Sequence, residues 1–340
     1  MDRPKTLPII ILVLVLAGFF IWAMLPKDDL TKTISEKLST DKEKADVIFQ
    51  DATLSEIYDG VKYWELLART AVINKTTGLA KMSAVDGLFF DKGKPAIKFL
   101  APSATWYINK NEIQLVTPIG YDIRSEKFIK EMLEKVSDRS KIYSIFHLPG
   151  IKPKTSEGFW FQAKNLSWKL ATKKLLCTGA ISLTKGNAVI NAERLEADVG
   201  MEKVLLTGNP KAEIETVSGK IVTTAREFLV DSGINTIIAN NDVTIKKGTS
   251  RIITGKSVYD QKKGSISLFG DVQITDQQIT AFSKSASYDV NSSKVVLMGK
   301  AKAKRGENEI YGEKMTIYLG KNKIVVEGRT KVKIKEAEIK

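Results

Sequence analysis

The chain opens with an uninterrupted apolar segment. Residues 6–26 carry no charge, and Leu7 to Leu25 are almost entirely aliphatic or aromatic. As a helix, such a segment spans about 30 Å, the thickness of the hydrocarbon core of a bilayer. Pro8 would lie in the first turn, where a missing N–H costs nothing, and Trp22 would lie near the far interface. The pattern predicts one transmembrane helix.

The alternative for this segment is a cleaved signal peptide. A signal peptide has a shorter apolar core followed by a small-x-small cleavage site, whereas Ala23-Met24-Leu25-Pro26 is a poor site. We therefore expect an uncleaved anchor. Arg3 and Lys5 precede the span, so the positive-inside rule places the N-terminus in the cytoplasm. Residues 1–27 thus comprise a short cytoplasmic N-terminus and the transmembrane anchor.

After a polar linker predicted at 28–47, short apolar strands alternate with turn residues from about Ile48 onward. Turn residues recur every 29 residues, once after 33, and small residues precede them by 16, or by 15 for Gly255. The turn residues are Gly179, Gly208, Asn241, Gly270, Gly299 and Gly328; the small residues are Ala163, Ala192, Ala225, Gly255, Ser283 and Gly312. Asn can replace Gly because both tolerate left-handed backbone angles. These offsets predict units of two strands separated by a turn, which must stack to bury a face.

Alternate residues on both sides of each turn are apolar. Because side chains of a strand alternate between its faces, these residues predict one continuous apolar inner surface. Its members are Val204, Leu206, Ile237, Val243, Ile245, Ile266, Leu268, Val272, Ile274, Val295, Leu297, Ile324 and Val326. Cys177 falls on the same face, and we interpret it as a buried structural thiol.

The opposite face of the last two units is basic. If the units stack in register, six cations form a ladder two strands wide: Lys300, Lys302, Lys304, Arg329, Lys331 and Lys333. One interpretation is a solvated edge that prevents runaway strand pairing. The other is a surface that contacts phosphorylated headgroups or an acidic partner.

One segment, residues 122–158, interrupts the strand pattern. Apolar residues at helical spacing predict an amphipathic helix over Glu126–Val136 that covers an end or edge of the sheet. His147 would lie in the loop that follows, as a structural or solvent-exposed residue.

The composition argues against most kinds of catalytic and metal-binding site. The 340 residues carry a net charge of +14 but only one Cys and one His, which excludes an intrachain disulfide and a cysteine zinc cluster and argues against a histidine metal site. No phosphate-binding loop, dinucleotide fingerprint or metalloprotease motif occurs. We therefore predict no catalytic residue, metal or cofactor, and no enzyme. Aromatic residues do not alternate with basic ones as in nucleic-acid stacking platforms, so we also predict no nucleic-acid partner.

Two stretches carry a family resemblance. After the anchor, Asp59-Gly60-Val61-Lys62-Tyr63-Trp64-Glu65-Leu66-Leu67-Ala68 resembles the start of the LptC family of lipopolysaccharide-export proteins. Later units, such as Ile310-Tyr311-Gly312-Glu313-Lys314-Met315 followed by Val325-Val326-Glu327-Gly328, resemble the OstA/LptA repeats of the same pathway. Together the resemblance covers about residues 8–335. The chain departs from an ordinary LptC in its additional LptA-like units and in its helical insertion.

The resemblance implies an all-β fold, an open β-jellyroll (β-taco) of stacked antiparallel strands. It divides the chain into an LptC-like part at 48–160 and LptA/OstA-like repeats at 161–340. It also implies a single-pass inner-membrane protein, held by residues 7–25, with its bulk in the periplasm. Such a bridge component would accept lipopolysaccharide from an LptB2FG-type ABC transporter near residues 48–75 and carry it along the apolar groove. The bridge component would then pass the lipopolysaccharide to an LptA- or LptD-type jellyroll at the edge near Ile310–Ile334.

Two other functions fit the same repeats. A closed, fully packed β-solenoid would serve as a spacer, and a tethered scaffold would bind only proteins. A groove that can open should tolerate Leu268→Asp with its fold largely intact, whereas a closed core should not.

Overall fold

The computed structural model describes residues 46–91, 93–134, 158–198, 201–231, 233 and 235–334. The predicted anchor at 7–25, most of the predicted linker and His147 lie outside the described residues. Within the described ranges, no helix is long and apolar enough to cross a membrane. The first strand begins at Asp46, inside the segment predicted as linker.

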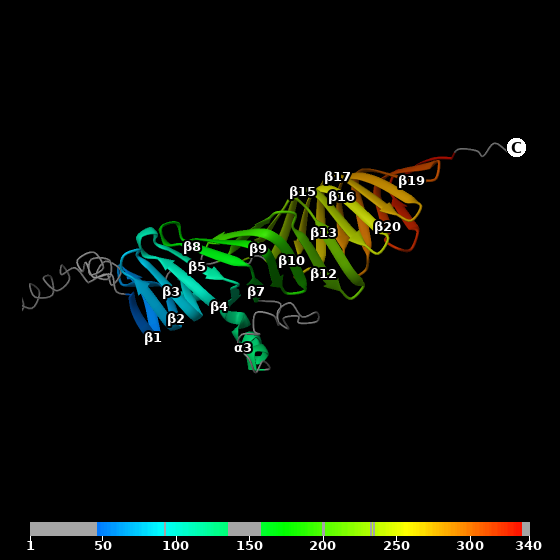
Figure 1. The fold of residues 1–340 in the computed structure, drawn as a ribbon. Helices are drawn as coiled ribbons and strands as arrows, with labels where there is room; N and C mark the ends of the chain where they lie inside the picture. Colours follow the sequence, from blue (N-terminus) through cyan, green and yellow to red (C-terminus); the bar gives the residue numbers. More distant parts are fainter. Residues whose placement is uncertain are drawn as a thin grey trace, which may run out of the picture.

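The described chain forms one 22-stranded antiparallel sheet in which most successive strands pair. Elsewhere the pairing skips along the chain, as in β5–β8, β7–β9, β11–β14 and β13–β15. The strands cross the long axis of an elongated body, and β1 and β20 lie near its opposite ends (Figure 1). The first strands are β1 (Asp46–Tyr58), β2 (Val61–Asn74), β3 (Leu79–Asp91), β4 (Lys94–Tyr107), β5 (Glu112–Val116), β6 (Ile119–Asp122), β7 (Phe159–Gln162) and β8 (Asn165–Lys169).

The later strands continue the same sheet. They are β9 (Lys174–Lys185), β10 (Ala188–Asp198), β11 (Lys203–Thr207), β12 (Lys211–Thr216), β13 (Gly219–Thr224), β14 (Glu227–Asp231), β15 (Thr236–Lys247), β16 (Ser250–Asp260), β17 (Ser265–Asp276), β18 (Ile279–Asp289), β19 (Lys294–Arg305), β20 (Asn308–Tyr318), β21 (Lys323–Glu327) and β22 (Lys331–Lys333).

The predicted helix is confirmed over its described part. α3 (Glu126–Glu134) follows the 3-10 turn η2 (Ile123–Ser125) and stands beside the body, near β4 and β7 (Figure 1). The Asp122 carboxylate caps η2 by accepting a hydrogen bond from the Ser125 amide at 2.9 Å. Lys98 on β4 holds Glu126 at 2.7 Å, which ties the helix to the sheet. Two further 3-10 turns are η1 (Ile108–Lys110) and η4 (Leu170–Thr172).

The recurring glycines mark corners, not chain reversals. At Gly270 and Asp271 two consecutive residues have left-handed angles, with φ of 81° and 47°, and the strand register shifts between Phe269 and Val272. The same pairs recur at Gly179/Ala180, Gly208/Asn209, Asn241/Asp242 and Gly299/Lys300. Most of these corners bend one strand within its length, as in β9, β15, β17 and β19, which differs from the predicted unit, whereas Gly208/Asn209 separates β11 from β12. The bends fold the sheet into two facing walls: β11 and β14 belong to the first, and β12 and β13 to the second.

The small residue that faces each corner is displaced by one position in one unit. Ser283 pairs with Val272, and Gly312 pairs with Ala301, in each case two residues beyond a corner glycine. The equivalent partner of Val243 is Thr254, not the predicted Gly255. Thr254 fits because its hydroxyl donates to the Phe269 carbonyl at 2.7 Å. The offset of 16 residues therefore holds in all six units.

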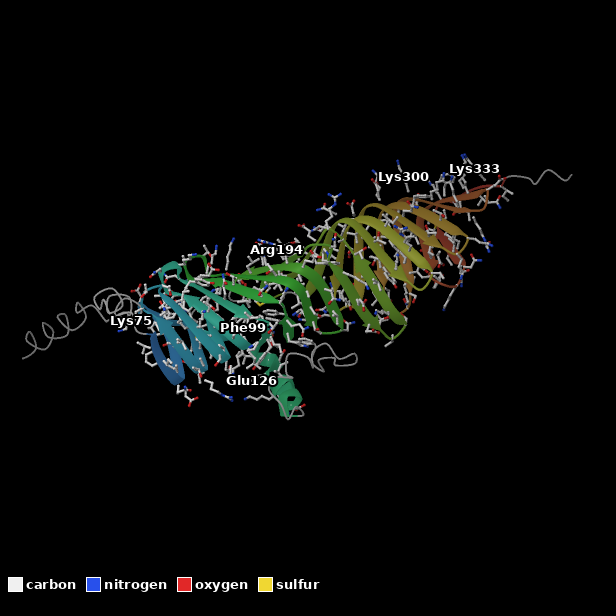
Figure 2. All side chains as sticks on the ribbon, viewed as in Figure 1. Lys75, Phe99, Glu126, Arg194, Lys300 and Lys333 are labelled. Carbon is white, nitrogen blue, oxygen red and sulfur yellow. The ribbon has the colours of Figure 1, made fainter. Side chains whose placement is uncertain are left out.

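The two walls bury one apolar cluster that runs from Trp64 to Leu319. Its part between β1 and β8 is rich in aromatic rings, including Phe99 (Figure 2), and its later part is mainly aliphatic. The interior is therefore continuous along the body, although its filling changes.

Candidate functional site

The predicted inner surface lies inside the roll. Its members from Val204 to Leu297 are buried, none more than 3% exposed. The strand register aligns them in rows along the long axis. One row contains Ala239, Ser257, Leu268, Ala286, Leu297, Met315 and Val326 in successive strands. Another contains Ile245, Ile252, Ile274, Ala281, Ala303 and Ile310.

The rows end on an edge strand. Ile324 and Val326, predicted with the inner surface, lie on β21 opposite Ile317 and Met315, and they are only partly buried. β21 pairs with β20 and, in the described chain, has no strand on its other side. The apolar interior is thus least enclosed at this end.

The burial of Leu268 changes the effect on stability that is expected of a charge at this position. The Leu268 side chain has no exposed area, so a carboxylate there would be buried without a partner. The structure therefore predicts severe destabilisation by Leu268→Asp, where the sequence alone predicted tolerance. Cys177 is likewise fully buried, as predicted, and burial raises the pKa of its thiol well above its ordinary value.

The two walls meet at their hairpins, along a line that we call the mouth, on the side away from the corners. Near β9, the Asn187 amide donates to the Tyr259 hydroxyl at 3.1 Å, and the Gln261 amide donates to the Lys185 carbonyl at 2.9 Å. These pairs join hairpins more than 70 residues apart in sequence. The sequence predicted a roll that is open on one side; the structure shows this side closed by polar contacts.

The same closure continues toward the C-terminal end. The Ser218 hydroxyl donates to the Val290 carbonyl at 2.5 Å, and the Lys247 ammonium donates to Ser218 at 2.5 Å and also to Ser293. Burial lowers the pKa of Lys247. Hydrogen bonds thus join the walls at the mouth, beside the buried apolar turn residues Val290 and Leu319.

A buried carboxylate completes the mouth. Asp276 has no exposed area; it accepts a hydrogen bond from the Ser250 hydroxyl at 2.6 Å and one from the Gly320 amide at 3.0 Å. These mouth residues were not predicted from the sequence, because the predicted inner surface ended four residues after each corner. Six residues after a corner, on the same inward face, stand Lys185, Lys247 and Asp276. A charge at the end of an otherwise apolar alternation was the available signal.

The predicted basic ladder is interrupted by β20. Register places Lys304, Glu309 and Lys333 in one row, and Lys302, Tyr311 and Lys331 in the next. Lys302 and Lys304 both form ion pairs with Glu309, at 2.8 and 3.1 Å. Lys300 lies at a corner and, with Lys333, projects from the C-terminal end of the body (Figure 2). Arg329 lies near that corner, beside a cleft that Lys300 also lines.

The two ends of the sheet are open edges. β1 pairs with β2, and β22 pairs with β20; neither has a second neighbouring strand within the described ranges. Ile48 and Phe49 on β1, and Val332 on β22, are exposed. The edges coincide with the segments 48–75 and 310–334 that the sequence marked as docking ends. In the described part of the chain, no group of three or more His, Cys, Asp or Glu side chains could hold a metal ion.

Comparison with known proteins places part of the chain. Residues 161–323 match the family model described as LptA/(LptD N-terminal domain) LPS transport protein. Among solved structures, the chain is similar to LptH, the LptA homologous periplasmic component of the lipopolysaccharide transport device from Pseudomonas aeruginosa. The identity is 17%, the TM-score 0.32, and the likeness covers 34% of this chain and 95% of LptH. No curated protein matches the chain. The family match falls on β7 to β21, the part predicted as LptA/OstA-like repeats.

Proposed function

We propose that this protein is a periplasmic bridge component that carries lipopolysaccharide, with the acyl chains held between the two walls. The observation that carries the proposal is the set of apolar rows along the long axis, within the segment that matches the LptA/LptD N-terminal family. An acyl chain in water costs about 0.8 kcal/mol per exposed methylene group. A glycolipid with several chains therefore needs a continuous apolar path.

Entry of a chain requires the walls to separate. The rows are closely packed, but the mouth is closed by contacts such as Asn187 to Tyr259 and Asp276 to Gly320. A single hydrogen bond adds only about 1 kcal/mol to net stability, since water can replace the lost partner. The mouth is therefore the side at which the roll opens at least cost.

The ends have separate partners in this proposal. An inner-membrane ABC transporter delivers lipopolysaccharide at the β1 edge, and an LptA- or LptD-type jellyroll docks at β21 and β22. Unpaired N–H and C=O groups on edge strands suit docking by strand addition. Residues 7–25 anchor the chain in the inner membrane, and the protein itself performs no ATP chemistry. These assignments rest on the LptC and OstA/LptA resemblance together with the two open edges.

A closed spacer or scaffold is the second candidate. The full enclosure of residues such as Leu268 and Leu297 favours it. Both the spacer and the scaffold predict that the interior never contacts lipid. The scaffold also predicts that function is sensitive to mutation at the end strands and tolerant in the middle.

Depletion of the protein in its native cell distinguishes the carrier from the spacer. We expect pulse-labelled lipopolysaccharide to remain in the inner-membrane fraction after depletion and to reach the outer membrane when the full chain is restored. Normal transport of new lipopolysaccharide during complete depletion would refute the carrier and favour the spacer.

A pull-down separates the two ends. Removal of residues 310–340 should abolish capture of the distal jellyroll while capture of the transporter persists. Circular dichroism of the shortened chain checks that the remaining strands stay folded. Loss of both partners from a folded shortened chain would contradict the assignment of the ends.

A further inference from the structure

A cleft on the outer surface of the second wall gathers positive charge. It has a volume of about 560 Å³ and lies over β12, β13, β15 and β16. Four cations line it: Lys211, Lys220, Lys246 and Arg251. The hydroxyl-bearing residues Thr224 and Thr244 line it as well, and no carboxylate is among its lining residues.

Two of the cations share one carboxylate, and two have none. Glu213, beside the cleft, forms ion pairs with Lys211 at 2.7 Å and with Lys220. Lys246 and Arg251 form no ion pair with any described residue. Both are exposed, and they occupy directly opposite positions on β15 and β16. Their other neighbours in the sheet are Val222 and Thr275, which carry no charge.

The equivalent positions of other hairpins provide an internal comparison. Glu215 faces Lys220, Thr275 faces Thr280, and Lys304 faces Glu309 with an ion pair of 3.1 Å. Like charges directly opposite one another destabilise an antiparallel pair, and opposite charges stabilise it. The β15–β16 hairpin therefore lacks the stabilising opposite-charge pair of the β12–β13 and β19–β20 hairpins. Two cations directly opposite each other are expected where an anion is to be bound.

We propose that this cleft binds phosphate groups. Arg251 supplies a planar fork for two phosphate oxygens, Lys246 a point charge, and Thr244 a hydroxyl donor. The hairpin that carries Lys246 and Arg251 outward also carries Lys247 and Ser250 inward at the mouth. A glycolipid whose chains enter at the mouth would place its phosphates here, and this choice of source rests on the proposed function.

The charge reversal Lys246→Glu tests the cleft. It creates an opposite-charge pair like that of Lys304 and Glu309, so the melting temperature should rise while phosphate binding falls. The matched control is Lys256→Glu, the same charge change at an exposed position of β16 on the first wall. In the full chain, titration with inorganic phosphate should shift the amide resonances of Thr244, Lys246 and Arg251. Lys246→Glu should weaken the Kd by at least about tenfold, and Lys256→Glu by less than about twofold.

A lipid titration distinguishes the source of the phosphate. Diphosphorylated lipid A in detergent micelles should bind the unmodified chain more tightly than dephosphorylated lipid A, and Lys246→Glu should remove that difference. Lipid A binding that depends neither on its phosphates nor on Lys246, with no phosphate shifts, would overturn the cleft while the proposed carrier stands. Phosphate binding that depends on Lys246, with no lipid A bound, would support the cleft and refute the carrier.

Discussion

The two halves of the roll share one architecture but fill it differently. Between β1 and β8 the interior is built from large rings in edge-to-face contact: Phe89 and Trp168 have centroids 4.1 Å apart, and Trp64 lies 5.4 Å from Trp106. Between β9 and β22 the rows consist mainly of Ile, Val, Leu and Ala. Rings interlock in one arrangement, whereas aliphatic rows repeat the same contacts from strand to strand. The first half is thus a unique core and the second a layered one.

The corners of the two halves differ in which residues take left-handed backbone angles. In the later half a glycine-like residue and its successor both take left-handed angles, as at Gly270 and Asp271. In the first half, residues with a Cβ take this conformation: Asp51, Ala84 and Thr117 have φ of 48°, 48° and 44°. A left-handed angle costs a residue with a Cβ about 1–2 kcal/mol. Residues with a Cβ bear this strain at corners of both halves: Ala180, Asp271 and Lys300 do so in the second, where a left-handed glycine precedes each of them.

The largest expected effect is the loss of a ring from the first half. Trp168→Ala should destabilise the protein by about 3–5 kcal/mol, since its contacts with Phe89 and Trp64 have no repeated substitute. The control Ile274→Val in the layered half should cost about 1 kcal/mol. Urea denaturation followed by near-ultraviolet circular dichroism measures both. Equal losses would remove the distinction between the halves.

The next effect concerns the mouth of the layered half. Asp276→Ala should cost about 2–3 kcal/mol, because the Ser250 hydroxyl and the Gly320 amide lose their buried acceptor. Asp276→Asn keeps an acceptor oxygen and should cost less. Hydrogen exchange should accelerate at Gly320 in the alanine variant. An unchanged exchange rate there would show that this carboxylate does not hold the walls together.

The corners should respond with opposite signs. Gly270→Ala should cost about 1 kcal/mol, because only the left-handed backbone opposes a Cβ whose nearest neighbour would lie 3.8 Å away. Ala84→Gly, at an exposed corner of the first half, should be neutral or stabilising by up to about 1 kcal/mol. Thermal melting of the two variants measures this difference, and a loss in both would contradict the strain assigned to Ala84.

The smallest effect is a pH dependence at the basic end. Hydrogen bonds from Lys302, Tyr311 and Lys304 lower the pKa of Glu309 from 4.5 to about 2. A carboxyl with a lower pKa in the folded state stabilises above pH 4.5, and this stabilisation is lost as the pH falls through 4.5 toward 2. Glu309→Gln should therefore reduce the drop in melting temperature between pH 6 and pH 3. Glu202→Gln serves as control, and an identical drop in both variants would contradict the ion-pair geometry.

The layered half could be predicted from sequence because its physics repeats. A glycine, or once an asparagine, at each corner and apolar alternation on both sides leave a fixed period, which revealed the inner surface and the burial of Cys177. The helix at Glu126–Glu134 was evident from its spacing. The period fades in the first half because corners at Asp51, Ala84 and Thr117 carry no glycine.

The misses have equally physical causes. Thr254 takes a position of small residues because its hydroxyl bonds to the backbone, so the pattern pointed to Gly255 instead. The basic ladder omitted β20, whose Glu309 forms ion pairs with two lysines. The pairing of Lys246 with Arg251 depends on hairpin register, which composition does not reveal.

Photocrosslinking at adjacent residues tests the central claim, that the interior of both halves is a path for acyl chains. Leu66 and Leu297 are fully buried, whereas their neighbours Leu67 and Met298 are 49% and 43% exposed on the same strands. A leucine-sized diazirine amino acid would be placed at each position in turn in the living cell, and the adducts probed for lipopolysaccharide. We predict lipopolysaccharide adducts at Leu66 and Leu297 and none at Leu67 and Met298. Folded protein without adducts at the two inward positions would contradict the carrier and leave a closed spacer.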